Sequence, residues 1–185
     1  MASREDIRSA ALPLFAKQGV AQTTAAQIAE AAGVTESEVL AEFGEVRTIL
    51  LRSDLYLRLL DTFLEVPAEL SPSAAWVVAI EESAKDVDAV EWQNDATRQG
   101  LLASDPIVGE YAVPMAMGVI ALTREVVAKR TGLPVDSPKV AAFAGAVIGP
   151  MGTMHSSEFA SPAEWVAAHA AAVEGLGPSL DALLR

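Results

Sequence analysis

The chain has 185 residues, of which 51% are apolar, and its formal net charge is −12 at pH 7. That composition excludes disordered and fibrous proteins, and the chain is long enough to bury a substantial core. Because it has no cysteine, disulfides and thiolate metal sites are excluded, and the two histidines, His155 and His169, are too few for an ordinary zinc centre. We expect no metal, no cofactor and a reducing, cytoplasmic location.

No segment is typical of a secreted or membrane protein. Charged residues begin at Arg4 with no apolar run behind them, which argues against a signal peptide. The longest strongly apolar run, residues 140–151, contains Gly and Pro and is shorter than the roughly 20 residues that a membrane span needs. We interpret this run as a buried helix and expect no membrane partner.

The first expected helix follows Ser3, which is a favourable N-cap residue. Its first turn carries Glu5 and Asp6, which the helix dipole favours, and Gly19 is placed to end it. Pro13 lies inside this helix, where it removes one backbone hydrogen bond and should bend the axis.

Residues 23–43 are expected to form two short helices around a glycine turn. Each helix opens with a hydroxyl residue followed three positions later by Gln or Glu, in the pairs Thr24 with Gln27 and Thr35 with Glu38. Both pairs are capping-box signatures. The segment therefore predicts a helix-turn-helix, the arrangement that places its second helix in the major groove of DNA.

The remainder of the chain is also helical in pattern, and no segment alternates like a strand. Several of the expected helices begin with Ser or Asp followed by Pro, which tolerates the first helical position. The fold is predicted to be all-α, with about nine helices. The later helices are expected over residues 47–65, 72–85, 86–103, 105–131, 138 onward, and 162 onward, the last interrupted by Gly175 and Gly177 before a final segment at 178–184.

A set of core, capping and turn residues is spread over the N-terminal quarter of the chain: Ile7, Ala11, Phe15, Gly19, Thr23, Thr24, Ile28, Ala29, Ala32, Gly33, Val34, Thr35, Phe43, Ile49 and Leu50. With these residues the N-terminal quarter resembles the DNA-binding domain of the TetR family of bacterial repressors. That resemblance implies a helix-turn-helix domain at residues 1–46 and a C-terminal ligand-binding and dimerisation domain at residues 47–185. It also implies a homodimer on palindromic operator DNA, released when a small molecule enters the C-terminal domain.

The expected DNA face is unusually acidic. Glu36 and Ser37 stand where the family commonly has a pair such as Lys-Gly, and Val46 replaces the lysine that usually touches phosphate. A TetR-fold protein that has lost DNA binding, and serves to bind a small molecule or a partner, is therefore the alternative to a repressor. The residues that remain as candidate DNA contacts are Thr23, Thr24, Gln27, Thr35, Glu36, Ser37 and Arg47.

A ligand pocket is expected in the C-terminal domain for an apolar or amphipathic small molecule. Met and aromatic residues at helical spacing more often form plain core than a ligand box, so the resemblance to the family favours the pocket more than the spacing does. A few polar residues could orient the ligand. The candidates are Trp76, Trp92, Asn94, Arg98, Tyr111, Met115, His155 and Phe159.

Catalysis is the weakest hypothesis. Apart from His155 and Glu158, one helical turn apart, no pair of residues suggests a nucleophile or an acid and base, so we predict no catalytic residues and no enzyme. Dimerisation has a stronger signal, because residues 140–148 and 165–173 are rich in alanine and allow helices to approach closely.

Overall fold

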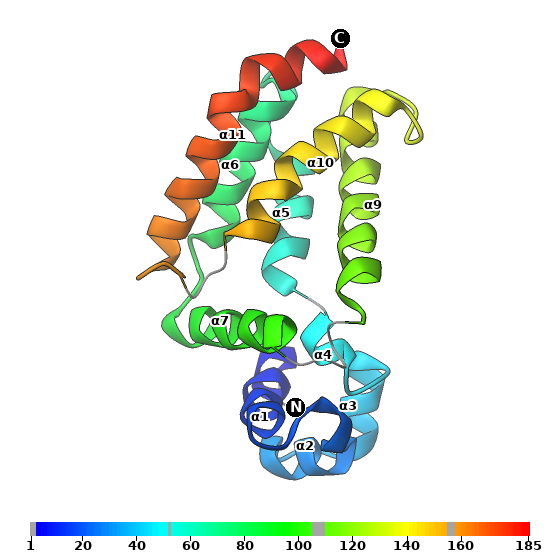
Figure 1. Ribbon diagram of the computed structural model, residues 1–185, viewed down its shortest axis with the longest axis vertical. Helices are drawn as coiled ribbons and strands as arrows, with labels where there is room; N and C mark the ends of the chain where they lie inside the picture. Colours follow the sequence, from blue (N-terminus) through cyan, green and yellow to red (C-terminus); the bar gives the residue numbers. More distant parts are fainter. Residues whose placement is uncertain (1–2, 52, 105–109, 155–157) are drawn as a thin grey trace. The chain divides into compact units, whose positions relative to one another are not determined.

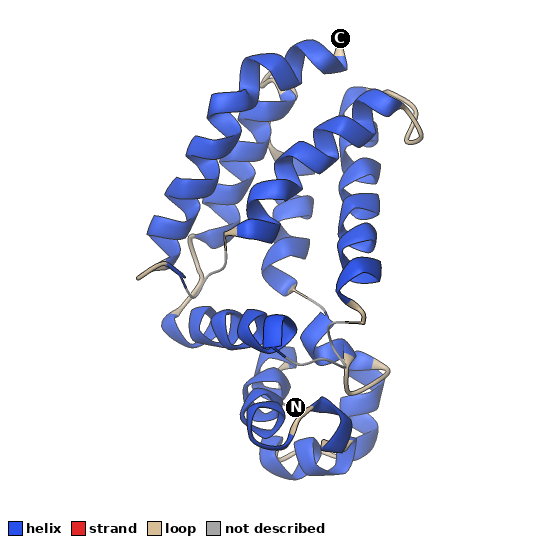
Figure 2. Cartoon of the chain, in the orientation of Figure 1, coloured by secondary structure: helices blue, strands red, loops and turns tan. Residues whose placement is uncertain are grey.

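The computed structural model describes residues 3–51, 53–104, 110–154 and 158–185. Over these residues the chain is helical and forms no strand, which confirms the all-α prediction (Figure 2). The elements, labelled in Figure 1, are α1 (Arg4–Gln18), the 3-10 turn η1 (Val20–Gln22), α2 (Ala25–Ala32), α3 (Glu36–Phe43), α4 (Thr48–Leu51), α5 (Asp54–Glu65), α6 (Pro72–Ala84), α7 (Ala89–Ser104), α9 (Ala112–Thr131), α10 (Pro138–Thr153) and α11 (Pro162–Leu184).

The chain divides into two compact units. Unit 1 contains Met1–Ser53 and Asp88–Val113, and unit 2 contains Asp54–Val87 and Pro114–Arg185. Unit 1 therefore holds α7 in addition to α1 through α4. The division of function at residues 46 and 47 stays a prediction.

In unit 1 the predicted caps are present. Thr24 and Thr35 each accept a hydrogen bond from the backbone three residues on, at 3.2 Å, and Gln27 and Glu38 reach back to the capping residue. Gly33 ends α2 in the left-handed conformation with φ 67°, as the tight turn before α3 requires. The two helices of the predicted helix-turn-helix are thus confirmed.

The core of unit 1 lies between α1, α2, α3 and α4. It buries large apolar side chains from each of them, and α7 adds two that are partly buried. Because so short a segment has little core of its own, the packing of α7 on α1 contributes to its stability. The fully buried side chains here are Ile7, Ala11, Leu12, Phe15, Ile28, Val39, Ile49 and Leu50.

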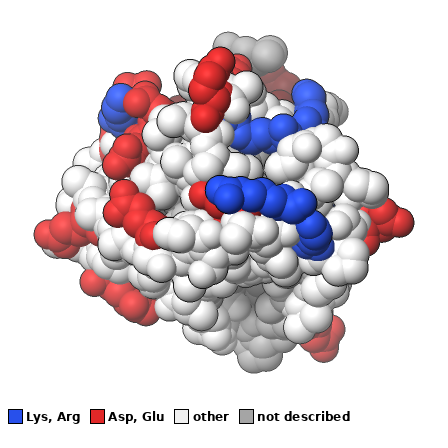
Figure 3. Space-filling model, turned by 90° about the horizontal axis from the view of Figure 1, so that it is seen from above, with Lys and Arg blue, Asp and Glu red and all other residues white. Residues whose placement is uncertain are grey.

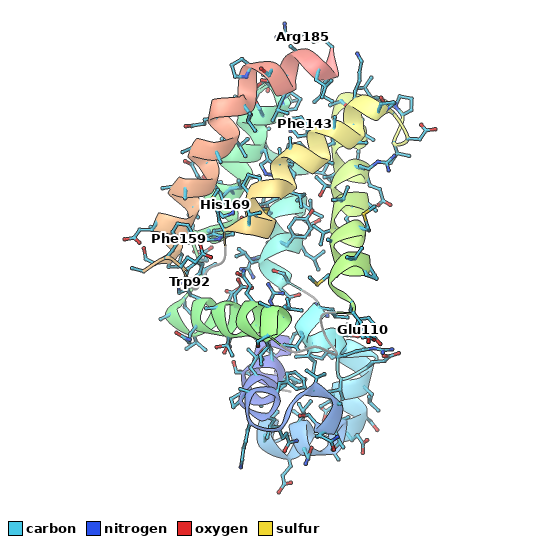
Figure 4. All side chains as sticks on the ribbon, in the orientation of Figure 1. Trp92, Glu110, Phe143, Phe159, His169 and Arg185 are labelled. Carbon is cyan, nitrogen blue, oxygen red and sulfur yellow. The ribbon has the colours of Figure 1, made fainter. Side chains whose placement is uncertain are left out.

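Unit 2 is built around α6, which α5 and α11 both contact. Trp76 on α6 is completely buried and meets Phe63 of α5 edge-on, with ring centroids 5.1 Å apart. Phe143 on α10 and His169 on α11 complete the interior and are labelled in Figure 4. The apolar run at 140–151, predicted to be a buried helix, lies within α10 and has Val140, Phe143 and its neighbours in this core.

Polar contacts join α9 to α5 within unit 2. The guanidinium of Arg130 donates to the carbonyl oxygens of Phe63 and Val66 at 3.1 and 2.8 Å, and to those of Pro67 and Leu70 at 2.6 and 3.2 Å. It thus binds one carbonyl in the last turn of α5 and three in the loop that follows this helix. Its carbon also lies 5.2 Å from the centre of the Phe63 ring.

The prediction of one helix over residues 47–65 is wrong. Ser53 is not helical, and α4 and α5 are separate elements on either side of it. Ser and Asp side chains offer nearby backbone groups alternative hydrogen bonds, which disfavours a helix interior at Ser53 and Asp54. The helix expected over 105–131 also begins later than predicted, because Glu110 and Tyr111 form a turn before α9; the predicted start at Asp105 and Pro106 lies outside the described residues.

The predicted interruption at Gly175 and Gly177 is wrong as well, because α11 runs unbroken through both and through Pro178. Gly177 serves a close approach between helices: a Cβ atom there would lie 3.0 Å from the Oγ of Ser73 on α6. Two hydrogen bonds from Ser73 to the carboxylate of Asp181, at 2.9 and 2.6 Å, hold the next turn of α11 in place.

Candidate nucleic-acid interface

The second helix of the pair, α3, presents one side to its own unit and the other to solvent. Val39 and Phe43 are buried in the core, whereas Glu36, Ser37, Leu40 and its neighbour Ala41 are exposed. The exposed side carries one hydroxyl, one carboxylate and two apolar groups, all of which can contact base edges in a major groove. None of these outward groups is cationic.

The neutral candidate contacts are unequally available. Thr24, Gln27 and Thr35 are exposed at the beginnings of α2 and α3, while Thr23 is 5% exposed and its hydroxyl donates to the carbonyl of Gly19 at 2.8 Å. Thr35 also donates its hydroxyl to Glu38 at 2.8 Å. Thr23 is therefore a structural residue in this conformation, and the exposed hydroxyl and amide groups surround the two helix N-termini.

Hydrogen bonds from Thr35 keep the carboxylate of Glu38 ionised. The backbone and hydroxyl groups of Thr35 lower the pKa of Glu38 below its ordinary value, because both favour the ionised form. Glu38 is therefore a firmly ionised cap, as its position in the sequence predicts. Its negative charge lies at the N-terminal end of α3, where the helix dipole stabilises it.

Most cations of this unit are paired with acids. Arg4 forms an ion pair with Glu42 of α3, and Arg8 is 5% exposed and bonded to Glu5 at 2.7 Å. Lys17 is exposed, and no ion pair involves it within the described chain. The basic footprint expected of a DNA-binding surface is accordingly weak.

Arg47 is the remaining cationic candidate. Its Nη2 lies 2.5 Å from the carboxylate of Glu45, and its Nη1 donates to the Tyr111 hydroxyl at 2.5 Å. The guanidinium carbon is 4.9 Å from the centre of the Tyr111 ring. These residues border a hollow of about 330 Å³ in unit 1, lined by Val20, Ala21, Glu45, Val46, Arg47, Leu51 and Tyr111.

Acidic groups dominate elsewhere too. In the face shown in Figure 3, acidic side chains are spread around the edge and cationic ones are confined to a few places. The net charge of −12 for the whole chain agrees with this distribution.

The predicted ligand residues are divided between the two units. Asn94 on α7 donates to Glu5 and Ser9 of α1 at 2.7 and 2.6 Å, and Arg98 donates to the Leu50 carbonyl at 3.2 Å. Both thus fasten α7 within unit 1, which also contains Trp92 and Tyr111.

Three other ligand candidates belong to unit 2. Trp76 is buried there, and the indole Nε1 has no hydrogen-bond partner among the described residues. Met115 and Phe159 are partly exposed. His155 lies outside the described residues.

His169 is a buried residue of unit 2 that was not among the predicted site residues. Its ring nitrogen Nδ1 donates to the Trp165 carbonyl at 2.8 Å, and the two rings lie 4.1 Å apart. Burial lowers the pKa of His169, opposed by the carbonyl groups of Trp165 and Pro150, so the imidazole is held neutral at pH 7. In the sequence, only the spacing of four residues between Trp165 and His169 indicates that the two side chains lie on the same side of a helix.

Two further searches of the described residues gave negative results. No group of three or more His, Asp or Glu side chains is placed to hold a metal ion. Among the described helices, none combines the length and the apolar character needed to cross a membrane.

Two capped helices joined by a glycine turn, with one side of the second facing solvent, define a helix-turn-helix protein. Residues 7–50 match the profile described as bacterial regulatory proteins, tetR family, and residues 70–181 match the profile described as the MftR C-terminal domain. The second match alone spans more than half of the chain. The chain belongs to the TetR family, which points to a transcriptional regulator and not to an enzyme.

The fold has a counterpart among solved structures. A transcriptional regulator from Rhodococcus sp. Rha1 is 17% identical, with a TM-score of 0.51 over 95% of this chain and 97% of that one. At this identity the likeness shows a shared fold. Among curated proteins, no match was found.

Proposed function

We propose that this TetR-family protein is a transcriptional repressor that binds palindromic operator DNA as a homodimer and leaves it when a small molecule binds. The observation that carries the proposal is the outward side of α3, where Glu36, Ser37 and Leu40 are exposed. They follow the turn between α2 and α3, and Thr35 and Glu38 form the capping box at the start of α3. The matched family supports a regulatory role. A cytoplasmic location follows from that role.

Operator binding would depend chiefly on neutral groups. Exposed Thr24, Gln27 and Thr35 lie at helix N-termini, where backbone N–H groups also bind phosphate. Arg47 and Lys17 would add few charges, and Glu36 would accept from cytosine amino groups. Affinity should then fall with salt much less steeply than the exponent of roughly −10 known for a strongly basic repressor.

Selection of bound sequences from a random duplex library tests the proposal. The wild type is compared with a Glu36→Lys, Val46→Lys variant, which places two positive groups per subunit on this face. We expect the wild type to enrich one palindromic site. Enrichment by the variant alone would refute DNA binding by the natural protein.

The alternative, a TetR-fold protein without DNA binding, is favoured by one specific observation. The side chains of Arg4, Arg8 and Arg47 are all paired with acids of their own unit, so a phosphate contact made by any of these three must first displace a partner. In that case ligand or partner binding would be the whole function. The library selection separates this alternative from the repressor.

Homodimer formation would use α10 and α11. Small residues are exposed along both helices: Ala142, Gly145 and Gly149 on α10, and Ala167, Ala171 and Gly175 on α11. Two such helices from each subunit could form a closely packed four-helix interface around a two-fold axis. Sedimentation of a monomer at micromolar concentration would refute it.

The ligand would enter the interior of unit 2. The buried Trp76 indole N–H lacks a partner among the described residues, and an acceptor on an amphipathic ligand could satisfy it. Such a ligand should quench Trp76 fluorescence and raise the melting temperature. A broad metabolite screen without any thermal shift would count against a sensor.

A further inference from the structure

Arg47 is held in unit 1 by two side chains at once. One terminal nitrogen donates to the Tyr111 hydroxyl at 2.5 Å, and the other pairs with Glu45 at 2.5 Å. One face of the guanidinium lies over the Tyr111 ring, 4.9 Å from its centroid. Both terminal nitrogens of Arg47 are therefore engaged by side chains of its own unit, and a phosphate must displace Tyr111 or Glu45 to reach them.

Tyr111, which contacts Arg47, is close in the chain to residues of unit 2. Tyr111 lies in the turn directly before α9, and from Pro114 onward the residues of α9 belong to unit 2. Arg47 directly precedes α4. The covalent chain thus connects the aromatic partner of Arg47 to a helix of the other unit.

We propose that Tyr111 is a positioning residue that keeps Arg47 away from DNA phosphate, so that the turn before α9 sets the DNA affinity of unit 1. This inference rests on the proposed function. It has a large consequence here because Arg4 and Arg8 are already paired with Glu42 and Glu5. Release of one guanidinium would therefore add a substantial share of the phosphate contacts.

The size of the effect follows from the exposure of the contact. Arg47 and Glu45 have side chains that are 45% and 60% exposed, so their ion pair is weak. An exposed cation–π contact corresponds to about two- to fivefold in affinity. We expect Tyr111→Ala to tighten operator binding by about threefold per subunit.

Operator affinity is measured over a range of salt concentrations for the wild type, Tyr111→Ala and Tyr111→Phe. Tyr111→Ala should bind more tightly and steepen the salt dependence by about 0.9 per subunit, which is the value of one phosphate contact. Tyr111→Phe, which retains the ring but not the hydroxyl, should lie between them. A purely structural role of Tyr111 would not steepen the salt dependence, so weaker binding or an unchanged slope would overturn the inference.

The same substitution in an Arg47→Ala background provides the matched control. There Tyr111→Ala should change neither the affinity nor its salt dependence, because no guanidinium remains to be released. An equal gain in both backgrounds would also overturn the inference. If Tyr111→Ala fails to fold, Glu45→Gln removes the other partner at an exposed position and should give a smaller gain in the same direction; no gain would contradict the proposal.

Failure of the proposed function is distinguishable from failure of this inference. If the wild type enriches no DNA sequence but the Glu36→Lys, Val46→Lys variant binds DNA, the repressor proposal fails by itself. Tyr111→Ala is then added to that variant, where the affinity for any duplex can be measured. Tighter binding with a steeper salt dependence would support the restraint of Arg47, and unchanged binding would refute it.

Discussion

The helix-turn-helix and unit 2 are stabilised by polar contacts of different range. In the helix-turn-helix, Thr24 and Thr35 bond to residues three positions away. In unit 2, Ser73 bonds to Asp181, and Arg130 bonds to carbonyls in the last turn of α5 and in the loop after it. The first kind of contact defines where single helices begin, and the second holds different helices together.

Because of this difference, substitutions in the helix-turn-helix and in unit 2 should change the stability of the protein by different amounts. Loss of a cap affects one helix end and leaves the neighbouring core intact. Loss of a contact between distant helices removes packing and leaves buried groups without partners. The largest effects on stability are therefore expected in unit 2.

Trp76→Ala should produce the largest loss of stability. Trp76 is completely buried among α5, α6 and their neighbours, and truncation of a buried Trp typically costs about 3–5 kcal/mol through lost burial and the cavity left behind. Urea unfolding followed by circular dichroism measures the change. Met117→Ala, at a side chain that is 60% exposed, is the control and should stay within about 0.5 kcal/mol of the wild type.

Arg130→Ala should have the next largest effect, about 2 kcal/mol of destabilisation. It removes hydrogen bonds to four carbonyl oxygens and the contact with the Phe63 ring. Arg130→Lys retains the charge but not the planar fork, so it should recover only part of the loss. Full recovery by lysine would show that charge alone is sufficient at this position.

Two glycines of α11 form a matched pair. At Gly177 an added Cβ would meet the Ser73 Oγ at 3.0 Å, and Asp181 holds that oxygen in place, so Gly177→Ala should destabilise by roughly 1 kcal/mol. At Gly175 a Cβ meets nothing within 4 Å, so Gly175→Ala should stabilise by about 0.5–1 kcal/mol through helix propensity. Equal effects in thermal unfolding would mean that the close approach of α6 and α11 is unimportant.

Sequence patterns predicted the contacts of short range best. The caps at Ser3, Thr24 and Thr35 are all present, because their partners lie within one helical turn. The unbroken course of α11 through Gly177 was missed, because the reason for that glycine is Ser73, far away in the sequence. A glycine that permits close packing and a glycine that ends a helix look the same in one sequence.

In the candidate site, too, short-range features could be predicted from the sequence and contacts between distant residues could not. The exposed groups on α2 and α3 could be predicted from helical spacing, but the burial of Thr23 depends on the shape of the chain at Gly19. Arg47 was predicted as a DNA contact and Tyr111 as a ligand contact. That the two touch could not be predicted, because 64 positions separate them in the sequence.

The smallest predicted effect is a loss of stability at low pH, which should differ between a contact that joins two helices, at Asp181, and a cap within one helix, at Glu38. Hydrogen bonds from Ser73 and Ser71 lower the pKa of Asp181 in spite of burial, which acts in the opposite direction, and those from Thr35 lower the pKa of Glu38. Because each folded-state pKa is below the ordinary value of 3.8 or 4.5, each carboxylate stabilises the fold fully above that value. The contribution is then lost as the pH falls through the folded-state pKa.

Asp181→Asn and Glu38→Gln therefore test the comparison directly. The difference in unfolding free energy between the wild type and each variant, measured from pH 7 down to about pH 3, should shrink as the carboxylates become protonated. The decrease should be larger for Asp181, whose hydrogen bonds to Ser73 join α6 to α11 and are partly buried, than for Glu38, whose hydrogen bonds with Thr35 are exposed and screened by solvent. A larger decrease for Glu38 would reverse the comparison, because a contact within one helix would then stabilise the protein more than one between helices.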